Sequence, residues 1–99
     1  ISIAGNWDSN WGPITFEHDP ITGNGPVEVT GHWQQGPKKM GVFKTGSYDP
    51  ATGVIKLTYY QNWNYLHGSA KFTINKKGNR MDGYFRQALI LSGTWIAWR

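Results

Sequence analysis

The sequence predicts an all-β fold: a single domain, residues 1–99, formed by an eight-stranded antiparallel up-and-down β-barrel. Three observations predict it. Short segments alternate apolar and polar residues, which is the period-2 pattern of half-buried strands. Thirteen glycines and five prolines separate these segments, and no window shows a helical stripe. A chain of 99 residues has room for one hydrophobic core.

The clearest predicted strand is Val27–Trp33, where every second residue from Val27 is apolar or glycine and the residues between are polar. Alternate residues of a strand point to opposite faces, so the first set is expected to face the core. The same reasoning gives eight strands: Ile3–Trp7, Pro13–His18, Val27–Trp33, Lys39–Tyr48, Ile55–Tyr60, Ser69–Ile74, Met81–Arg86 and Ser92–Trp98.

The inward positions of these strands predict the core. In Lys39–Tyr48, Val42 and Phe43 fall on opposite faces, so we expect a β-bulge there. The predicted core residues are Ile3, Trp7, Val27, Val29, Trp33, Ile55, Leu57, Phe72, Ile74, Met81, Phe85 and Trp95.

A glycine stands two residues before an aromatic residue five times along the chain. A glycine in a strand allows a sharp bend and leaves a gap over which a neighbouring ring can fold, and both help a sheet to close into a barrel. The repeats are Gly5-Asn6-Trp7, Gly31-His32-Trp33, Gly46-Ser47-Tyr48, Gly83-Tyr84-Phe85 and Gly93-Thr94-Trp95.

In a meander of eight strands the connections alternate between the two ends of the barrel. The even-numbered connections, 19–26, 49–53 and 75–79, carry Asp, Asn, Pro and Gly, as tight turns require. The odd-numbered connections, 8–12, 34–38, 59–65 and 87–91, carry rings, amides and an apolar run. We therefore expect a binding site at the odd-numbered end, since rigid scaffolds often hold function on loops.

The chemistry of the odd-numbered end predicts a neutral, hydroxyl-rich ligand, namely a carbohydrate. Aromatic rings stack on the apolar faces of sugar rings, while side-chain amides both donate to and accept from hydroxyl groups. The segment Tyr59–His67 contains no Lys or Arg. The predicted ligand-binding residues are Asn10, Trp11, Gln34, Gln35, Gln61, Asn62, Trp63, Asn64, Tyr65 and His67.

Three alternatives stay open. Trp11 or Trp63 could fold back and plug the barrel. The net charge of +4 favours acidic partners, so we also consider single-stranded nucleic acid, which we rank below carbohydrate. Finally, Tyr84, Ile96 and Trp98 are predicted to point outward on adjacent strands, where they would form an apolar patch suited to a protein partner or a homo-oligomer.

Catalytic, metal and cofactor sites are not predicted. Most acidic residues fall at turns or on outward strand faces, with no acid–base pair across a cleft. In Glu17-His18-Asp19, strand alternation predicts that the three side chains do not converge. The three histidines lack partners at metal-ligand spacing. The domain is therefore expected to be a non-catalytic binding module.

Two segments resemble known barrels. Gly5–Gly12, with Val29–Trp33, is similar to the opening strands of the avidin and streptavidin family, which implies an eight-stranded up-and-down barrel. Biotin binding is not implied, because Ser9 and Pro13 stand where that family has polar ligand-holding side chains, and proline cannot donate. Segments 78–84 and 92–99 resemble small bacterial extracytoplasmic barrel domains of unassigned function that repeat Gly-x-Trp.

The sequence also predicts location. No apolar run approaches the ~20 residues that a membrane-spanning helix needs, so no membrane span is expected. The chain starts at Ile1 rather than Met, which suggests a processed secreted protein or a domain cut from a longer chain. Together with the resemblance, this predicts a secreted or extracytoplasmic protein.

Overall fold

The computed structural model describes residues 1–88 and 90–99, and every element in it is a β-strand or a connection. Within the described residues, no helix is long and apolar enough to cross a membrane. The strands are β1 (Gly5–Ser9), β2 (Ile14–Glu17), β3 (Val27–Glu28), β4 (Thr30–Gly36), β5 (Lys39–Asp49), β6 (Val54–Gln61), β7 (His67–Ile74), β8 (Arg80–Gln87) and β9 (Leu91–Trp98).

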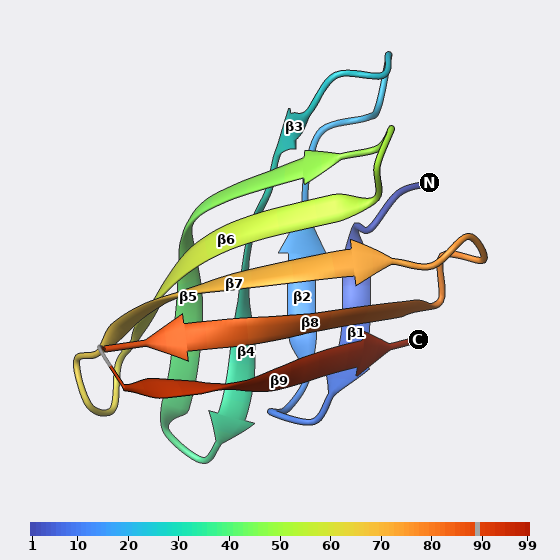
Figure 1. The fold of residues 1–99 in the computed structure, drawn as a ribbon. Helices are drawn as coiled ribbons and strands as arrows, with labels where there is room; N and C mark the ends of the chain where they lie inside the picture. Colours follow the sequence, from blue (N-terminus) through green and yellow to red (C-terminus); the bar gives the residue numbers. More distant parts are fainter. Residues whose placement is uncertain (89) are drawn as a thin grey trace.

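Eight of these strands close into the predicted antiparallel up-and-down barrel. Its order is β5-β4-β2-β1-β9-β8-β7-β6, and the β5–β6 pairing closes the ring. The short strand β3 pairs with β5 alone, as an addition to the barrel. Both chain termini lie at the end that carries the β2–β3, β5–β6 and β7–β8 connections (Figure 1).

The predicted strand Val27–Trp33 is interrupted at Val29 and becomes β3 and β4. Val29 is buried, and its backbone N–H still donates to the carbonyl oxygen of Gly46 at 3.0 Å. Both pieces lie against β5, with Val27 opposite Tyr48 and Gly31 opposite Phe43. The alternation predicted the direction of the side chains but not the break in the ladder.

The bulge predicted in Lys39–Tyr48 is present. Phe43 pairs with Tyr59 and Thr45 pairs with Thr58, so Lys44 is the extra residue on β5. One extra residue exchanges the inward and outward positions. As a result both Phe43 and Tyr48 are buried, although one has an odd number and the other an even number.

Ten of the twelve predicted core residues are buried, and the other two, Val27 and Phe85, are partly buried and packed against the core. Ile3 is buried, as predicted, although it precedes β1. The predicted start of the first strand at Ile3 was therefore wrong, whereas the predicted burial of Ile3 was right. Tyr48 was missed because its inward direction depends on the bulge. The core residues not predicted are Ile14, Phe16, Phe43, Tyr48, Tyr59, Ala70 and Ala97.

Large inward rings lie over glycines on the neighbouring strand. Trp33 stands directly opposite Gly41, and a Cβ added there would collide with the indole ring. Phe85 stands opposite Gly93, where an added Cβ would lie 2.8 Å from the ring. The cross-strand pairs of this kind are Phe43–Gly31, Trp33–Gly41, Tyr59–Gly68, Phe72–Gly83 and Phe85–Gly93.

Arg99 closes the end of the barrel at which both chain termini lie. Its guanidinium lies 4.2 Å from the ring centroid of Trp7, which is a cation–π contact. The same group donates to the carbonyl oxygens of Gly78 at 2.9 Å and Ser2 at 2.7 Å. Arg99 thereby ties β1, the β7–β8 turn and both termini together.

Replacing Gly41 with alanine tests the ring–glycine pairing. The added methyl group would meet the buried Trp33 ring, so we expect the free energy of unfolding to fall by about 1–3 kcal/mol. Urea denaturation followed by tryptophan fluorescence measures it. Gly25→Ala is the control, because nothing lies within 4 Å of a Cβ at Gly25. Equal effects at both positions would contradict the pairing.

Replacing Arg99 with alanine tests whether this residue stabilises the end of the barrel at which both termini lie. Loss of the cation–π contact and of the hydrogen bond to Gly78 is expected to lower the free energy of unfolding by about 1–3 kcal/mol. Thermal unfolding monitored by circular dichroism checks this. Arg80→Ala is the comparison, since Arg80 forms an exposed ion pair with Asp82 at 2.9 Å and should matter less.

Candidate ligand-binding site at the barrel mouth

The four odd-numbered connections meet at one end of the barrel, here called the mouth. The β1–β2, β4–β5, β6–β7 and β8–β9 connections and adjoining strand ends contribute side chains to one cavity. The parity argument from the sequence is therefore confirmed as a grouping of loops. Of the predicted segment 87–91, Leu89 lies outside the described residues.

The cavity at the mouth has a volume of about 240 Å³ and opens to solvent. Its wall combines six aromatic rings, four side-chain amides and one leucine, and none of these described side chains is charged. The lining residues are Trp11, Trp33, Gln35, Tyr59, Gln61, Trp63, Asn64, Phe85, Gln87, Leu91 and Trp95.

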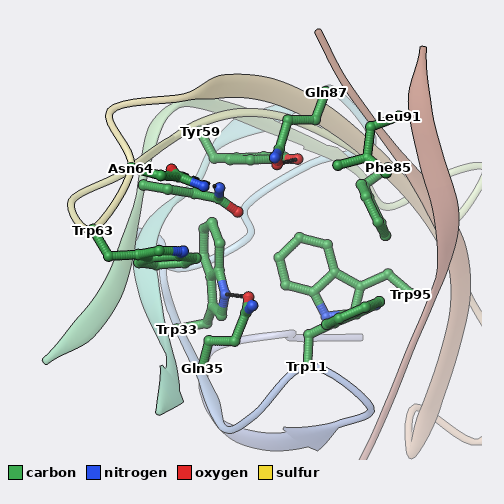
Figure 2. Close-up of a pocket in the computed structure, with 11 residues that line it drawn as sticks. Trp11, Trp33, Gln35, Tyr59, Trp63, Asn64, Phe85, Gln87, Leu91 and Trp95 are labelled. Carbon is green, nitrogen blue, oxygen red and sulfur yellow. Dashed lines mark hydrogen bonds between the residues drawn. The ribbon is translucent and has the colours of Figure 1, made fainter. Parts of the chain in front are cut away.

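Trp33 and Trp95 separate the cavity from the core of the barrel. Their ring centroids are 4.9 Å apart in an edge-on arrangement, and Tyr59 lies edge-on to Trp33 at 5.1 Å. Both indoles are nearly fully buried. Figure 2 shows Trp63 beside Trp33 and Trp11 beside Trp95, so the indoles form two sides of the opening.

Neither Trp11 nor Trp63 plugs the barrel. Trp63 packs edge-on against Trp33 at 6.3 Å and is partly buried. Trp11 packs edge-on against Phe85 at 5.5 Å, its Nε1–H donates to the carbonyl oxygen of Thr94 at 2.9 Å, and 38% of its surface stays exposed. Both rings line the cavity instead of filling it.

Donor-only groups orient the amides at the rim. The indole N–H of Trp33 donates to Gln35 Oε1 at 3.2 Å. The backbone N–H of Leu66 donates to Asn64 Oδ1 at 3.2 Å, and Gln61 Nε2 donates to the same oxygen at 3.0 Å. Because an indole or backbone N–H can only donate, it must meet the amide oxygen, and this decides which end of each amide is free.

Tyr59 and Gln87 form a buried polar pair beneath the rim. The Tyr59 hydroxyl donates to Gln87 Oε1 at 2.8 Å, and both residues are buried. Burial raises the pKa of Tyr59 to about 12 by disfavouring the phenolate. The phenol therefore remains a donor, and its hydrogen bond occupies the Gln87 oxygen.

The free amide ends make the polar rim rich in donors. The side-chain nitrogens of Gln35, Asn64 and Gln87 donate to none of the described residues. Gln61 Nε2 is bound to Asn64, whereas Gln61 Oε1 accepts from none of the described residues. As far as the described residues show, the mouth thus combines apolar rings with three free NH₂ groups and one free carbonyl oxygen.

Five of the ten predicted ligand-binding residues line the cavity. They come from three connections or the strand ends beside them, which the fold brings together. These residues are Trp11, Gln35, Gln61, Trp63 and Asn64.

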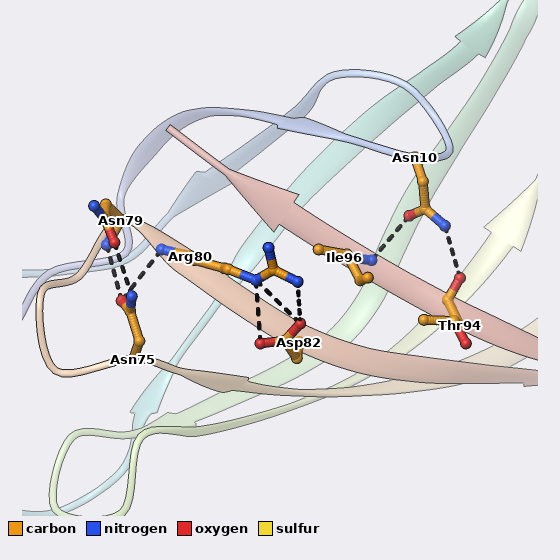
Figure 3. Close-up of polar contacts among 7 residues, drawn as sticks. All are labelled: Asn10, Asn75, Asn79, Arg80, Asp82, Thr94 and Ile96. Carbon is orange, nitrogen blue, oxygen red and sulfur yellow. Dashed lines mark hydrogen bonds and ion pairs between the residues drawn. The ribbon is translucent and has the colours of Figure 1, made fainter.

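Three of the remaining predicted residues support the loops. Asn10 continues the sheet: its Oδ1 accepts from the backbone N–H of Ile96 at 2.8 Å and its Nδ2 donates to Thr94 (Figure 3). Asn62 Oδ1 accepts from the backbone N–H of Met40 at 3.0 Å. Gln34 Nε2 donates to the carbonyl oxygen of Gly36 at 2.6 Å.

The last two predicted residues lie outside the cavity lining. Tyr65 is 75% exposed and has a φ of 60°. His67 begins β7, where its Nδ1 contacts the Lys44 ammonium at 3.1 Å and its ring lies 4.9 Å from Tyr60. His67 thus faces the outer surface of the sheet.

Sequence reasoning assigned Trp33, Phe85 and Trp95 to the core alone and left Gln87 out of the site. The missing signal was strand parity continued to the strand ends. Gln87 shares the inward face of β8 with Phe85, just as Gln61 shares that of β6 with Tyr59. An amide at the last inward position of a strand necessarily lies at the rim.

The Glu17-His18-Asp19 segment departs from the predicted alternation. β2 ends at Glu17, and all three side chains border one surface hollow together with Glu28. His18 holds the N-terminal segment, since its Nε2 accepts from the backbone N–H of Ile3 at 3.1 Å. Among the described residues, no group of three or more His, Cys, Asp or Glu is arranged to hold a metal ion.

Comparisons with protein-family models, curated proteins and solved structures gave no match. The resemblance to the avidin family remains a prediction.

The raised pKa of Tyr59 predicts how stability responds to alkali. Unfolded tyrosine ionises near 10.0, whereas folded Tyr59 holds its proton to about 12. Its contribution is therefore fully present below pH ~10 and is lost as the pH rises towards ~12. Phenolate absorbance should show a late titration step whose amplitude Tyr59→Phe reduces. Burial also raises the pKa of Tyr48, so part of the late absorbance change should remain in this variant. A late step of unchanged amplitude in Tyr59→Phe would contradict the assignment.

Proposed function

We propose that the domain is a non-catalytic binding module whose mouth holds one ring of a neutral, hydroxyl-rich ligand, with carbohydrate as the ligand class. One observation carries the proposal: an open cavity whose described lining combines six aromatic rings with four amides and has no charged side chain. Apolar walls with a few oriented polar groups are typical of small-molecule sites.

The dimensions favour a single ring. A volume of about 240 Å³ is below the roughly 300–1,000 Å³ of pockets that enclose a drug-sized molecule. Trp11 and Trp63, on opposite sides, offer ring faces or edges to the apolar C–H groups of one sugar residue. The rest of a longer glycan would extend into solvent.

The polar rim suits hydroxyl and ring oxygens. Sugar oxygens can accept from the free NH₂ groups of Gln35, Asn64 and Gln87, and a hydroxyl can donate to Gln61 Oε1. A phosphate would find no cation in the described lining to offset its desolvation. The uncharged lining therefore supports a neutral ligand over a phosphorylated one.

Protein interaction is the second candidate, because the outward residues lie as predicted. Tyr84 on β8 is 54% exposed and Trp98 on β9 is 44% exposed, while Ile96 is partly buried. On β8, Arg80 and Asp82 stand opposite Trp98 and Ile96, so the apolar residues share this outer face with an ion pair. A protein partner or second copy there would leave the mouth free.

Trp63→Ala tests the carbohydrate proposal. Removing one wall of the cavity should abolish glycan-array signals or weaken them about fivefold to thirtyfold, given ~1–2 kcal/mol for a lost aromatic contact. Trp98→Ala is the matched control, since it removes an indole from the outer surface. An array without hits, or hits that survive Trp63→Ala, would contradict the proposal.

A further inference from the structure

Two lysines stand directly opposite each other on the outside of the barrel. Lys56 on β6 is the register partner of Lys71 on β7. Like charges in directly opposed positions destabilise a sheet, so the pair works against the fold. The ion pair found among the described residues joins Arg80 and Asp82, so neither lysine is offset by an acid within 4 Å there.

Two further cations extend the charge across the same sheet. Arg86 on β8 is the register partner of Ser69, which itself stands opposite Thr58. Lys44, the bulge residue of β5, borders the same hollow as Arg86. The outer surface of β5–β8 thus carries two adjacent rows of cationic side chains. Lys56 and Lys71 form one row, and Lys44 and Arg86 form the next.

These side chains line a continuous depression. A hollow of about 440 Å³ holds Lys56 and Lys71, and a neighbouring hollow of about 400 Å³ holds Lys44 and Arg86. The two hollows share Thr58 and Ser69. Neither includes an acidic residue among its described lining. Asp49 lines the next hollow, which Lys56 and Lys71 also border, but it forms no ion pair with either lysine among the described residues.

The remaining groups in the depression suit a polyol. Ser47 and Ser69 present hydroxyl groups, which can both donate and accept. The Thr45 and Thr58 hydroxyls also line the hollow and are bonded to each other at 2.6 Å. Tyr84, the register partner of Lys71, borders the first hollow and is 54% exposed, so its ring is free to stack.

We propose that this depression, which we call the basic groove, binds an anionic polysaccharide. Carboxylate or sulfate groups along the chain would pair with Lys56, Lys71 and Arg86, its hydroxyls would bond the Ser and Thr side chains, and one sugar ring would stack on Tyr84. The groove lies outside the barrel and does not depend on the mouth.

A polysaccharide fits better than single-stranded nucleic acid. Nucleic acid binding without sequence preference uses a series of aromatic rings on which successive bases stack. The described lining of the first hollow offers one such ring, Tyr84, among several hydroxyl groups. Three of the four cations are lysines, whose compact charges suit carboxylates as well as phosphates.

The experiment measures the affinity of the full chain for an oligogalacturonate by calorimetry at low ionic strength. Lys56→Gln/Lys71→Gln should lower the affinity at least about tenfold, because two charge contacts are lost. Lys76→Gln/Lys77→Gln removes the same charge from the β7–β8 turn and should have little effect. Fully methyl-esterified oligogalacturonate, which lacks the carboxylate charge, should bind the original protein and Lys56→Gln/Lys71→Gln equally, because these lysines do not line the uncharged mouth.

A second variant separates binding from folding. Lys71→Glu places opposite charges face to face, so it should raise the unfolding temperature while abolishing oligogalacturonate binding. Equal losses in the two double variants, or binding that survives Lys71→Glu, would overturn the proposal. An absence of oligogalacturonate binding would also overturn it. Tighter binding of oligothymidylate than of oligogalacturonate would overturn it as well and would assign the groove to nucleic acid.

Discussion

The fold depends on pairing large inward rings with glycines on the neighbouring strand. A small barrel lacks the width to hold three buried tryptophans unless some facing positions have no side chain. Gly41 gives that space to Trp33, and Gly93 gives it to Phe85. The pairing lets the strands curve tightly, and it directs Trp33 and Trp95 against each other, where they form the floor of the mouth.

The two ends of the barrel use polar groups differently. At the end opposite the mouth, Arg99 donates to backbone carbonyls and covers Trp7. Its hydrogen bonds therefore stabilise the closed end of the barrel. At the mouth, donor-only groups occupy the amide oxygens of Gln35 and Asn64 and leave their nitrogens free. One end is therefore tied shut, whereas the other presents oriented donors around an apolar opening.

Charge is separated from the mouth by the geometry of strands. Inward side chains at the rim are rings and amides, while Lys56, Lys71 and Arg86 point outward from the same strands. The basic groove and the uncharged cavity thus occupy two faces of one sheet. This division underlies the two proposals, a neutral ring at the mouth and an anionic chain on the outer surface.

The sequence by itself determined the barrel, the grouping of the loops and most of the core, because alternation and turn residues are local properties. The bulge too was visible, since Val42 and Phe43 break the alternation. Only the tertiary structure decided that Asn10 and Asn62 support loops while Gln87 lies at the rim. An amide can bond backbone or ligand equally well, so its role depends on which groups the closed barrel brings within reach.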